Sequence, residues 1–314
     1  MNLSIIIPHY NSSNFLEKLL LSIPKKKDIQ VIIVDDKSEL SHLKVIYELK
    51  KIYSFDFFQN NRDKGAGSCR NIGLEIAIGK WILFADSDDF FVNNFYHKVS
   101  TYFNSLNDVI FFSPTSQYIE TGKIAGRHLS FKKKINAYMK NNNKKNEFLL
   151  RYTYIVPWSR MIKKEFIKNH KINFDEVRIS EDVMFATKVG HFMKKFEVTK
   201  DEIYCIVNRS NSFSKITIKE DIFDIWVYMK ISYIKFLVEN ISKEELCKIM
   251  KPFIRNKAAE VLFRSFNKFG FKKFFQVYKL FKRENIKCFR LVYLNPIKII
   301  KYIIILCYKK INDR

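Results

Sequence analysis

Short apolar runs alternate with amphipathic stretches over the opening part of the chain. The runs are rich in β-branched residues and end at polar or turn residues, which is typical of buried parallel strands. We expect such strands at residues 3–7, 29–34, 55–58, 81–84 and 109–112. The intervening stretches at 15–23, 40–51 and 68–78 carry apolar residues at helical spacing. Together these patterns predict a doubly wound α/β sheet with helices on both faces.

The pattern changes after the fifth predicted strand. Residues 117–146 are polar and include a run of three lysines and a run of three asparagines, so we expect a long loop or small insertion there. A strand-like piece returns at 204–207, and the pattern becomes helical from Thr217 onward. We therefore predict an α/β catalytic domain over residues 1–216 and a helical, basic region over residues 217–314.

Polar residues follow each of the first four predicted strands. Ligands of doubly wound sheets bind outside the carboxyl ends of the strands, so these residues are the functional candidates. Acids clustered there repel one another unless a cation or hydrogen-bond donors meet them. The residues are Pro8, His9, Tyr10 and Asn11 after the first strand, Asp35 and Asp36 after the second, Asn60 to Gly73 after the third, and Asp86, Ser87, Asp88 and Asp89 after the fourth.

The chemistry of these groups suits a nucleotide and a divalent cation. A carboxylate such as Asp35 can accept the N–H of uracil, and an aromatic ring such as that of Tyr10 can stack on the base. Asp86 is placed for the ribose hydroxyls. Asp88 is placed for Mg²⁺ or Mn²⁺, because hard cations take oxygen ligands and bridge phosphates.

Two glycines and an arginine in the third segment suit an anion. Gly65 and Gly67 allow close backbone approach, and the helix that follows points its N-terminus at the ligand. Arg70 can add a bidentate phosphate contact. Each of these features alone also fits a solvated turn. Their order along consecutive strand ends is what indicates a site.

Several strings, taken in order, resemble the motifs of family-two glycosyltransferases. They are SIIIPHYN, VIIVDDKS, NRDKGAGSCRNIG and WILFADSDDF, followed by VPWSRMIKKEFI and FDEVRISEDVMF, which resemble the acceptor-side segment and the ED motif. The resemblance covers about residues 1–210. It implies the GT-A fold, a Rossmann-like, mostly parallel sheet with flanking helices, here followed by an α-helical C-terminal appendage. It also implies an inverting transfer, typically from a UDP-sugar with a divalent metal.

The resemblance also implies roles by position. Asp182 would be the catalytic base and Glu181 would support the acceptor or the loop, at the start of a helix expected over 183–190. The alternative is that both acids only favour the helix N-terminal dipole. Trp158 would stack on an acceptor sugar, with a core position as its alternative. The donor would contact Pro8, Tyr10, Asn11, Asp35, Asp36, Lys64, Gly65, Arg70, Asp86 and Ser87, and Asp88 would hold Mg²⁺ or Mn²⁺.

Two departures from the family pattern bear on function. His9 stands where the family more often has a small or β-branched residue, which we expect to change little. The Q/R-x-x-R-W signature of processive polysaccharide synthases is absent, so we expect a single added sugar. The expected donor is a UDP-hexose or a UDP-N-acetylhexosamine. The expected acceptor is a hydroxyl of a growing cell-surface glycan, such as a lipooligosaccharide, an O-antigen or a capsule. This glycan acceptor is either free or lipid-linked.

The positive charge of the chain is concentrated near its end. The formal net charge is +24, and residues 246–314 hold 18 Lys or Arg against three acids. Aromatic residues are interleaved with these lysines, as in basic amphipathic helices that lie in a membrane interface. The apolar run at 302–308 is shorter than the roughly 20 residues that a spanning helix needs. We expect peripheral attachment to the anionic inner face of the plasma membrane, with packing of the helical region on itself as the alternative.

The remaining composition narrows the function classes. Five scattered cysteines without a C-x-x-C pair argue against a disulfide framework, and the N-terminus offers no secretory signal, so we expect a cytoplasmic location. A nucleic-acid-binding or membrane-binding protein on a non-catalytic nucleotide-binding fold is one competing class. We expect no nucleic acid, because no reader motif is present and acids at the strand ends repel phosphates. A sugar nucleotidyltransferase would need a G-x-G-T-R-type loop where Pro8 to Asn11 stand.

Overall fold

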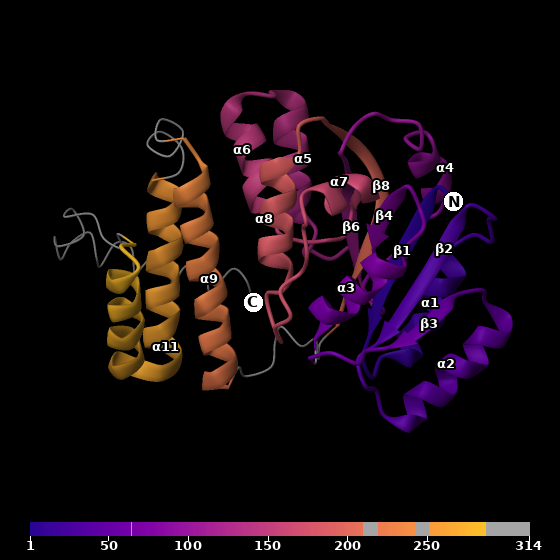
Figure 1. Ribbon diagram of the computed structural model, residues 1–314, viewed down its shortest axis with the longest axis horizontal. Helices are drawn as coiled ribbons and strands as arrows, with labels where there is room; N and C mark the ends of the chain where they lie inside the picture. Colours follow the sequence, from indigo (N-terminus) through magenta and orange to yellow (C-terminus); the bar gives the residue numbers. More distant parts are fainter. Residues whose placement is uncertain (64, 210–218, 243–250, 287–314) are drawn as a thin grey trace. The chain divides into compact units, whose positions relative to one another are not determined.

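The chain divides into two compact units after Ile225. The structure, a computed structural model, describes residues 1–63, 65–209, 219–242 and 251–286. The first unit is an α/β unit built on one sheet, and the described part of the second is helical (Figure 1). The predicted boundary at residue 216 and the apolar run at 302–308 lie outside the described residues.

The first unit contains an eight-stranded mixed sheet in the order β3-β2-β1-β4-β7-β6-β8-β5. Its parallel half consists of β1 (Leu3–His9), β2 (Ile29–Asp35), β3 (Asp56–Gln59) and β4 (Trp81–Phe84). β7 (Arg160–Lys163) is antiparallel to β4 and to β6 (Val109–Tyr118). β8 (Phe196–Asn208) is parallel to β6, and the short β5 (Phe90–Phe91) is antiparallel to β8.

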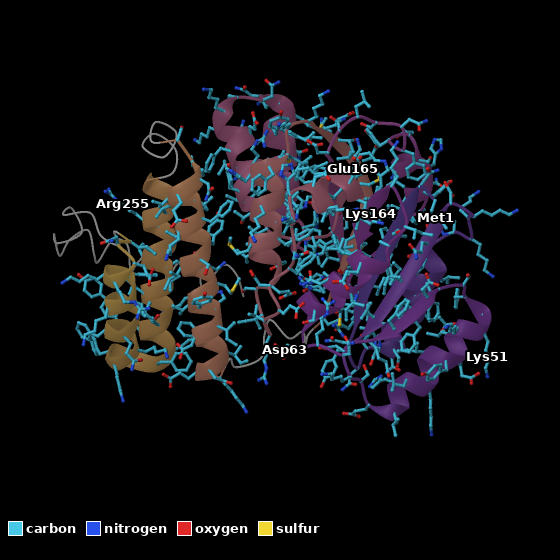
Figure 2. The ribbon with its side chains drawn as sticks, in the orientation of Figure 1. Met1, Lys51, Asp63, Lys164, Glu165 and Arg255 are labelled. Atoms are coloured by element: carbon cyan, nitrogen blue, oxygen red, sulfur yellow. The ribbon has the colours of Figure 1, made fainter. Side chains whose placement is uncertain are left out.

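Helices cover both faces of this sheet, as the sequence predicts. Ile5 and Ile7 of β1 pack in one core cluster, and Ile6, which points to the other face, packs in a second cluster. α1 (Ser13–Ser22), α2 (Leu40–Ile52) and α4 (Phe95–Ser100) contribute to the first cluster. α3 (Ala66–Ile76), α7 (Lys164–Asn169) and α8 (Asp182–Phe192) contribute to the second. Charged side chains such as Lys51 at the end of α2 extend into solvent (Figure 2).

The strand predictions for β1, β2, β4 and the start of β6 are confirmed, whereas β3 differs in burial. β3 is the last strand of the sheet and pairs only with β2 among the described strands, so most of its residues are exposed. β5 and β7 were not predicted, because β5 has only two residues and β7, unlike β4, is not a continuous apolar run. The buried Cys69 and Cys205 are free thiols, and the other three cysteines lie outside the described residues.

The stretch 117–146, where we expected a long loop or small insertion, is not a continuous loop. It contains α5 (Leu129–Lys140) and the start of α6 (Lys144–Thr153). Ile135 is the one buried residue of α5, so the apolar stripe of this helix is too narrow to stand out in the sequence. Asn143, the last of the three asparagines, caps α6 by accepting a hydrogen bond from the Asn146 backbone N–H.

The described part of the second unit contains long helices. α9 (Glu220–Asn240) crosses the division between the units, and α11 (Lys251–Arg283) is broken at Gly270, whose φ is 75°. Lys235 of α9 donates a 2.8 Å hydrogen bond to Glu284, which follows α11. Among the residues with described positions, no helix has the length and apolar character that crossing a bilayer requires.

Candidate active site

The sheet brings the carboxyl ends of β1, β2 and β4 to one edge. His9 is in register with Asp35, and the Asp36 backbone N–H donates a 2.7 Å hydrogen bond to the His9 carbonyl. β4 lies on the other side of β1 and leads directly into Asp86. The order of strand ends that the sequence indicates therefore becomes a spatial cluster.

Asp35 is fully buried at this edge and is held by a network of hydrogen bonds. His9 Nδ1 lies 2.8 Å from Asp35 Oδ1, and Ser38 donates to the same carboxylate through its backbone N–H and its hydroxyl. Burial alone would raise the pKa of Asp35, but the hydrogen bonds from His9 and Ser38 outweigh burial and lower that pKa. The network therefore stabilises the fold at pH values above the ordinary Asp pKa, and this contribution is lost as pH falls through the lowered pKa.

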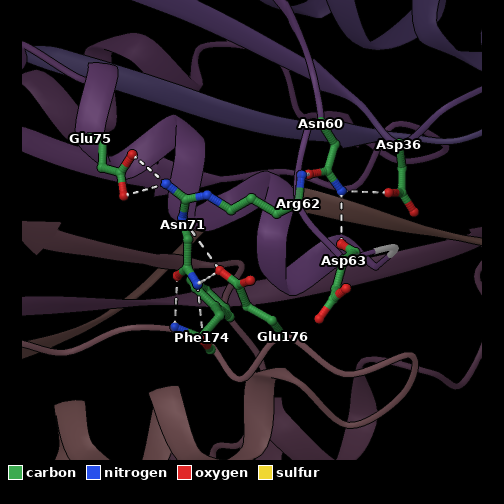
Figure 3. A network of polar contacts seen from close by, with 8 residues as sticks. All are labelled: Asp36, Asn60, Arg62, Asp63, Asn71, Glu75, Phe174 and Glu176. Carbon is green, nitrogen blue, oxygen red and sulfur yellow. Dashed lines mark hydrogen bonds and ion pairs between the residues drawn. The ribbon is translucent and has the colours of Figure 1, made fainter.

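This network changes two expectations. His9, which we expected to matter little, is the buried partner of Asp35. Asp35, which we expected to meet a base N–H, has both carboxylate oxygens engaged by the protein and no exposed surface. In the neighbouring Asp36, Oδ1 accepts a 2.8 Å hydrogen bond from Asn60 Nδ2 (Figure 3). Asp36 is also buried, with 5% of its surface exposed, whereas Asp35 has none.

The other donor-side candidates of β1 surround the same edge. Tyr10 is exposed, and Pro8 is buried inside β1 opposite Val34. Asn11 joins the two loops, since its backbone N–H donates to Ser38 Oγ and its Oδ1 accepts from the Glu39 backbone. Lys64 lies outside the described residues.

The D-S-D-D turn after β4 alternates between open and buried side chains. Asp86 and Asp88 are partly exposed, with 34% and 26% of their side-chain surface accessible. Asp89 is buried and accepts hydrogen bonds from the Tyr204 hydroxyl and the Val207 backbone. Burial, together with the nearby charges of Asp88 and Asp86, raises the pKa of Asp89. The Ser87 hydroxyl lies 2.6 Å from that of Ser12, so Ser87 helps to fix the turn.

Asp88 forms an ion pair with Arg209, at the end of β8. Burial raises the pKa of Asp88, the neighbouring charge of Asp86 raises it further, and Arg209 only partly compensates. Because Asp86 and Asp88 repel each other, their carboxylates suit a hard cation. The described residues contain no group of three or more His, Cys, Asp or Glu side chains that could hold a metal ion. The sequence analysis did not single out Arg209 as a site residue. Arg209 directly follows β8, so it stands at a strand end like the other candidates.

Arg70 joins the turn after β4 to the ED motif. Its Nη2 donates to Asp86 Oδ1 at 2.8 Å and its Nη1 donates to Glu181 Oε1 at 2.7 Å. The side chain is almost fully buried; burial alone would lower its pKa, but the two carboxylates raise it. Both terminal nitrogens are thus occupied by protein carboxylates, and the expected bidentate phosphate contact is not available in this arrangement.

The ED motif stands at the beginning of α8. Glu181 is the N-cap residue of the helix and Asp182 is its first residue. Asp182 interacts electrostatically with Arg70 and with the buried Arg160, in addition to any effect of the helix dipole. Through Arg70, the motif and the carboxylates after β4 belong to one site even though they are far apart in sequence.

A family model described as Glycosyl transferase family 2 matches residues 4–170, which is more than half of the chain. The chain belongs to glycosyl transferase family 2. The matched residues contain every strand of the parallel half of the sheet and the acids after β4. The ED motif lies beyond them.

Two curated relatives of this family-2 chain are poly(ribitol-phosphate) glycosyltransferases. It is 27% identical over 226 residues to a poly(ribitol-phosphate) beta-glucosyltransferase of Bacillus spizizenii, covering 69% of this chain and 34% of that protein. It is 22% identical over 258 residues to the poly(ribitol-phosphate) beta-N-acetylglucosaminyltransferase TarS of Staphylococcus aureus, covering 78% of this chain and 43% of TarS. The chain thus spans less than half the length of either relative.

Solved structures share the fold. The crystal structure of S. aureus TarS 1–349 in complex with UDP-GlcNAc superposes with a TM-score of 0.59 at 18% identity, covering 83% of this chain and 81% of that one. The mannosyltransferase PcManGT from Pyrobaculum calidifontis, in complex with GDP-Man and Mn²⁺, gives a TM-score of 0.55 at 12% identity, covering 88% and 79%. The predicted GT-A architecture of this family-2 chain is therefore confirmed.

Two other candidates of this family-2 chain have different surroundings from those expected. Trp158 is only 7% exposed and stacks on Tyr204 at a centroid distance of 5.8 Å, so it occupies the core position that was its alternative role. Gly65 and Gly67 do permit a close approach, but the closest neighbours are the backbone carbonyls of Val177 and Asp175. These carbonyls belong to the loop before the ED motif.

Proposed function

We propose that the protein is an inverting glycosyltransferase that moves one sugar from a UDP-sugar to a hydroxyl of a cell-surface glycan. The observation that supports the proposal is the Arg70 bridge, in which Arg70 donates hydrogen bonds to Asp86 after β4 and to Glu181 of the ED motif. The similarity to TarS, whose structure was solved with UDP-GlcNAc, supports a UDP-sugar donor. The relatives' names support a hexose or an N-acetylhexosamine as the transferred sugar.

On this proposal the donor lies along the strand ends. Asp36 accepts the N–H of uracil, and the exposed Tyr10 ring stacks on the base. Asp86, which keeps one carboxylate oxygen free of Arg70, binds the ribose hydroxyls. Asp88 would hold Mg²⁺ or Mn²⁺, and the bound cation would supply positive charge for the leaving diphosphate. Arg209 exchanges its ion pair with Asp88 for a position beside that diphosphate.

Asp182 acts as the base. Its carboxylate takes the proton of the acceptor hydroxyl while the acceptor oxygen forms a bond to the anomeric carbon. The bond from that carbon to the diphosphate oxygen breaks on the opposite face, and the electron pair leaves with the nucleotide, so the configuration inverts. A positioned base contributes roughly 10²–10⁴-fold to the rate.

The donor assignment is tested with a panel of nucleotide sugars and Mn²⁺. We expect UDP-glucose or UDP-N-acetylglucosamine to raise the melting temperature and to be hydrolysed slowly, with no response to the matching GDP- or ADP-sugars. Asp36→Ala should weaken UDP binding about tenfold or more, since a hydrogen bond to a charged group contributes about 1.5–3 kcal/mol. The solvent-facing Asp201→Ala is the matched control. A response to GDP-sugars alone, or no response to any, would refute the UDP-sugar proposal.

We also propose that the second unit holds the enzyme against an anionic membrane, where a lipid-linked acceptor would be reached. α11 carries ten Lys or Arg residues against one acid. Phe271 and Phe275, which follow the break at Gly270, are 68% and 55% exposed. Anionic headgroups contribute about 1 kcal/mol per nearby basic residue, and inserted aromatic rings add burial that salt does not screen. This arrangement supports a peripheral position on the cytoplasmic face.

The membrane proposal predicts binding to vesicles that contain phosphatidylglycerol. Phe271→Ser with Phe275→Ser should reduce the bound fraction at least tenfold in co-sedimentation, because each buried Phe contributes about 1.5–3 kcal/mol. Tyr228→Ser, at an exposed aromatic of α9, is the control and should bind normally. High salt should weaken binding only partly. Equal binding to neutral vesicles and to anionic ones, or preference for duplex DNA, would contradict the proposal.

A further inference from the structure

The ED loop, defined as residues 174–181, contacts the segment that follows β3, and Phe174 at its start also packs on Phe84 of β4 and Phe185 of α8. We propose a clamp whose function is to position the ED loop, and with it Asp182, for proton transfer. The clamp consists of Arg62, Gly65, Gly67, Arg70, Asn71 and Glu75. This inference rests on the proposed role of Asp182 as the base. The motif NRDKGAGSCRNIG, which the sequence suggests for phosphate binding, would then serve the catalytic base instead.

Asn71 of α3 is the central contact of the clamp. Its Oδ1 accepts a 2.9 Å hydrogen bond from the Phe174 backbone N–H, and its Nδ2 donates a 3.0 Å hydrogen bond to the Phe174 carbonyl (Figure 3). The amide group therefore pairs with the loop backbone as a neighbouring strand would. Both bonds are buried, so losing the side chain would leave a backbone donor and acceptor unsatisfied. Asn71 Nδ2 also donates to Glu176 Oε1 at 3.1 Å.

The two glycines determine how closely the loop approaches. A Cβ atom on Gly67 would lie 2.2 Å from the Asp175 carbonyl oxygen and 3.0 Å from the Glu181 Cβ. Gly67 lies within the first turn of α3, where glycine is a poor helix former. The close approach of the ED loop therefore accounts for glycine at this position. A Cβ on Gly65 would meet the Val177 carbonyl oxygen at 2.8 Å, and the φ of 151° at Gly65 adds a second requirement.

Two arginines tie down the sides of the loop. Arg70 donates to Glu181 at 2.7 Å from an almost fully buried position. Arg62 donates to Glu176 at 3.3 Å and to Glu75 at 2.8 Å, but it is partly exposed and contributes less. Within the loop, the described backbone contact from Asp175 to Glu181 is long, at 3.4 Å. The clamp therefore supplies polar contacts along the loop, in addition to the packing of Phe174 on Phe84 and Phe185.

The clamp predicts a loss of turnover without a loss of donor binding. A displacement of about 1 Å can cost about 100-fold in rate. We expect Gly67→Ala and Asn71→Ala to lower kcat by about 10- to 100-fold, because the loop must shift, while the Kd for UDP changes by less than about threefold. Amide hydrogen exchange of residues 174–181 should become faster in both variants, and this readout does not depend on activity.

Gly73→Ala is the matched control. It lies on the same helix, and its Cβ would meet the Ile6 side chain at 2.4 Å in the core instead of the ED loop. We expect Gly73→Ala to lower the melting temperature while kcat per folded molecule and exchange of the ED loop stay normal. The control separates loss of stability from loss of positioning.

Each possible result decides the proposal. Faster exchange of the ED loop with reduced kcat and intact UDP binding supports the clamp. Unchanged exchange, or faster exchange with normal kcat, overturns it, and a parallel loss of UDP binding would return the segment to a donor-binding role. If Asp182→Asn kept full turnover, the proposed base would fail, but the exchange measurement would still show whether the clamp holds the loop.

Discussion

Replacement of Asp182 by Asn should reduce sugar transfer by roughly 10²–10⁴-fold, because the amide cannot take the acceptor proton. The affinity for the UDP-sugar should stay within a few-fold of the wild type, since the donor contacts that we propose lie at the ends of β1, β2 and β4. Initial rates of transfer and UDP-sugar titration, both on the purified full-length variant, measure the two quantities separately.

Glu181→Gln is the informative companion to Asp182→Asn. Glutamine can still accept the hydrogen bond from Arg70 but loses the charge, so we expect a smaller loss of turnover than for Asp182→Asn. If Asp182 served only the helix dipole, its replacement would cost about 0.3–1 kcal/mol of stability and leave turnover per folded molecule normal. That outcome would remove Asp182 from the mechanism.

Asp88→Ala should abolish metal-dependent binding of UDP and lower transfer at least about 100-fold, because metal stabilisation of the leaving charge is worth several kcal/mol. Excess EDTA should silence the wild type, and Mn²⁺ or Mg²⁺ should restore it. Calorimetric titration of UDP with and without Mn²⁺ checks the binding directly. The matched variant is Arg209→Met, which removes the ion-pair partner of Asp88 but leaves its carboxylate.

We expect Arg209→Met to keep metal-dependent UDP binding while turnover falls, since a positive charge beside the diphosphate is lost. Asp89→Asn should instead lower stability, because Asp89 accepts buried hydrogen bonds from Tyr204 and Val207. Full activity of the wild type in excess chelator would refute the metal assignment. In that case Arg209, rather than a metal ion, would neutralise the charge of the leaving nucleotide.

The sequence predicts the parallel half of the sheet well, because its signal is local. β1, β2 and β4 are buried on both faces, so each reads as a continuous apolar run, and α1, α2 and α3 each show a helical period. A helix that buries few residues shows no clear apolar period in its sequence. α5 buries only Ile135, so the sequence does not predict it. Antiparallel β7, four residues long, shows no period and follows from pairing with β4 and β6.

The site divides in the same way. The order of motifs along the chain determined that Asp35, Asp86 and Asp88 follow strands, and therefore that acids gather at one edge of the sheet. Tertiary structure alone decided their partners. Asp35 is buried against His9, 26 residues away, and Asp36 accepts a hydrogen bond from Asn60, 24 residues away. Asp88 meets Arg209 across 121 residues.

Folding also decided what the third motif contacts. From the sequence, Gly65, Gly67 and Arg70 suit a phosphate equally well, because glycine and arginine are what an anion site requires. In the fold the two glycines admit the carbonyls of the ED loop, and Arg70 meets Glu181 across 111 residues. Local sequence specifies which chemical groups stand at a strand end. The order of strands in the sheet brings distant segments beside them, and only that order determines which group each one binds.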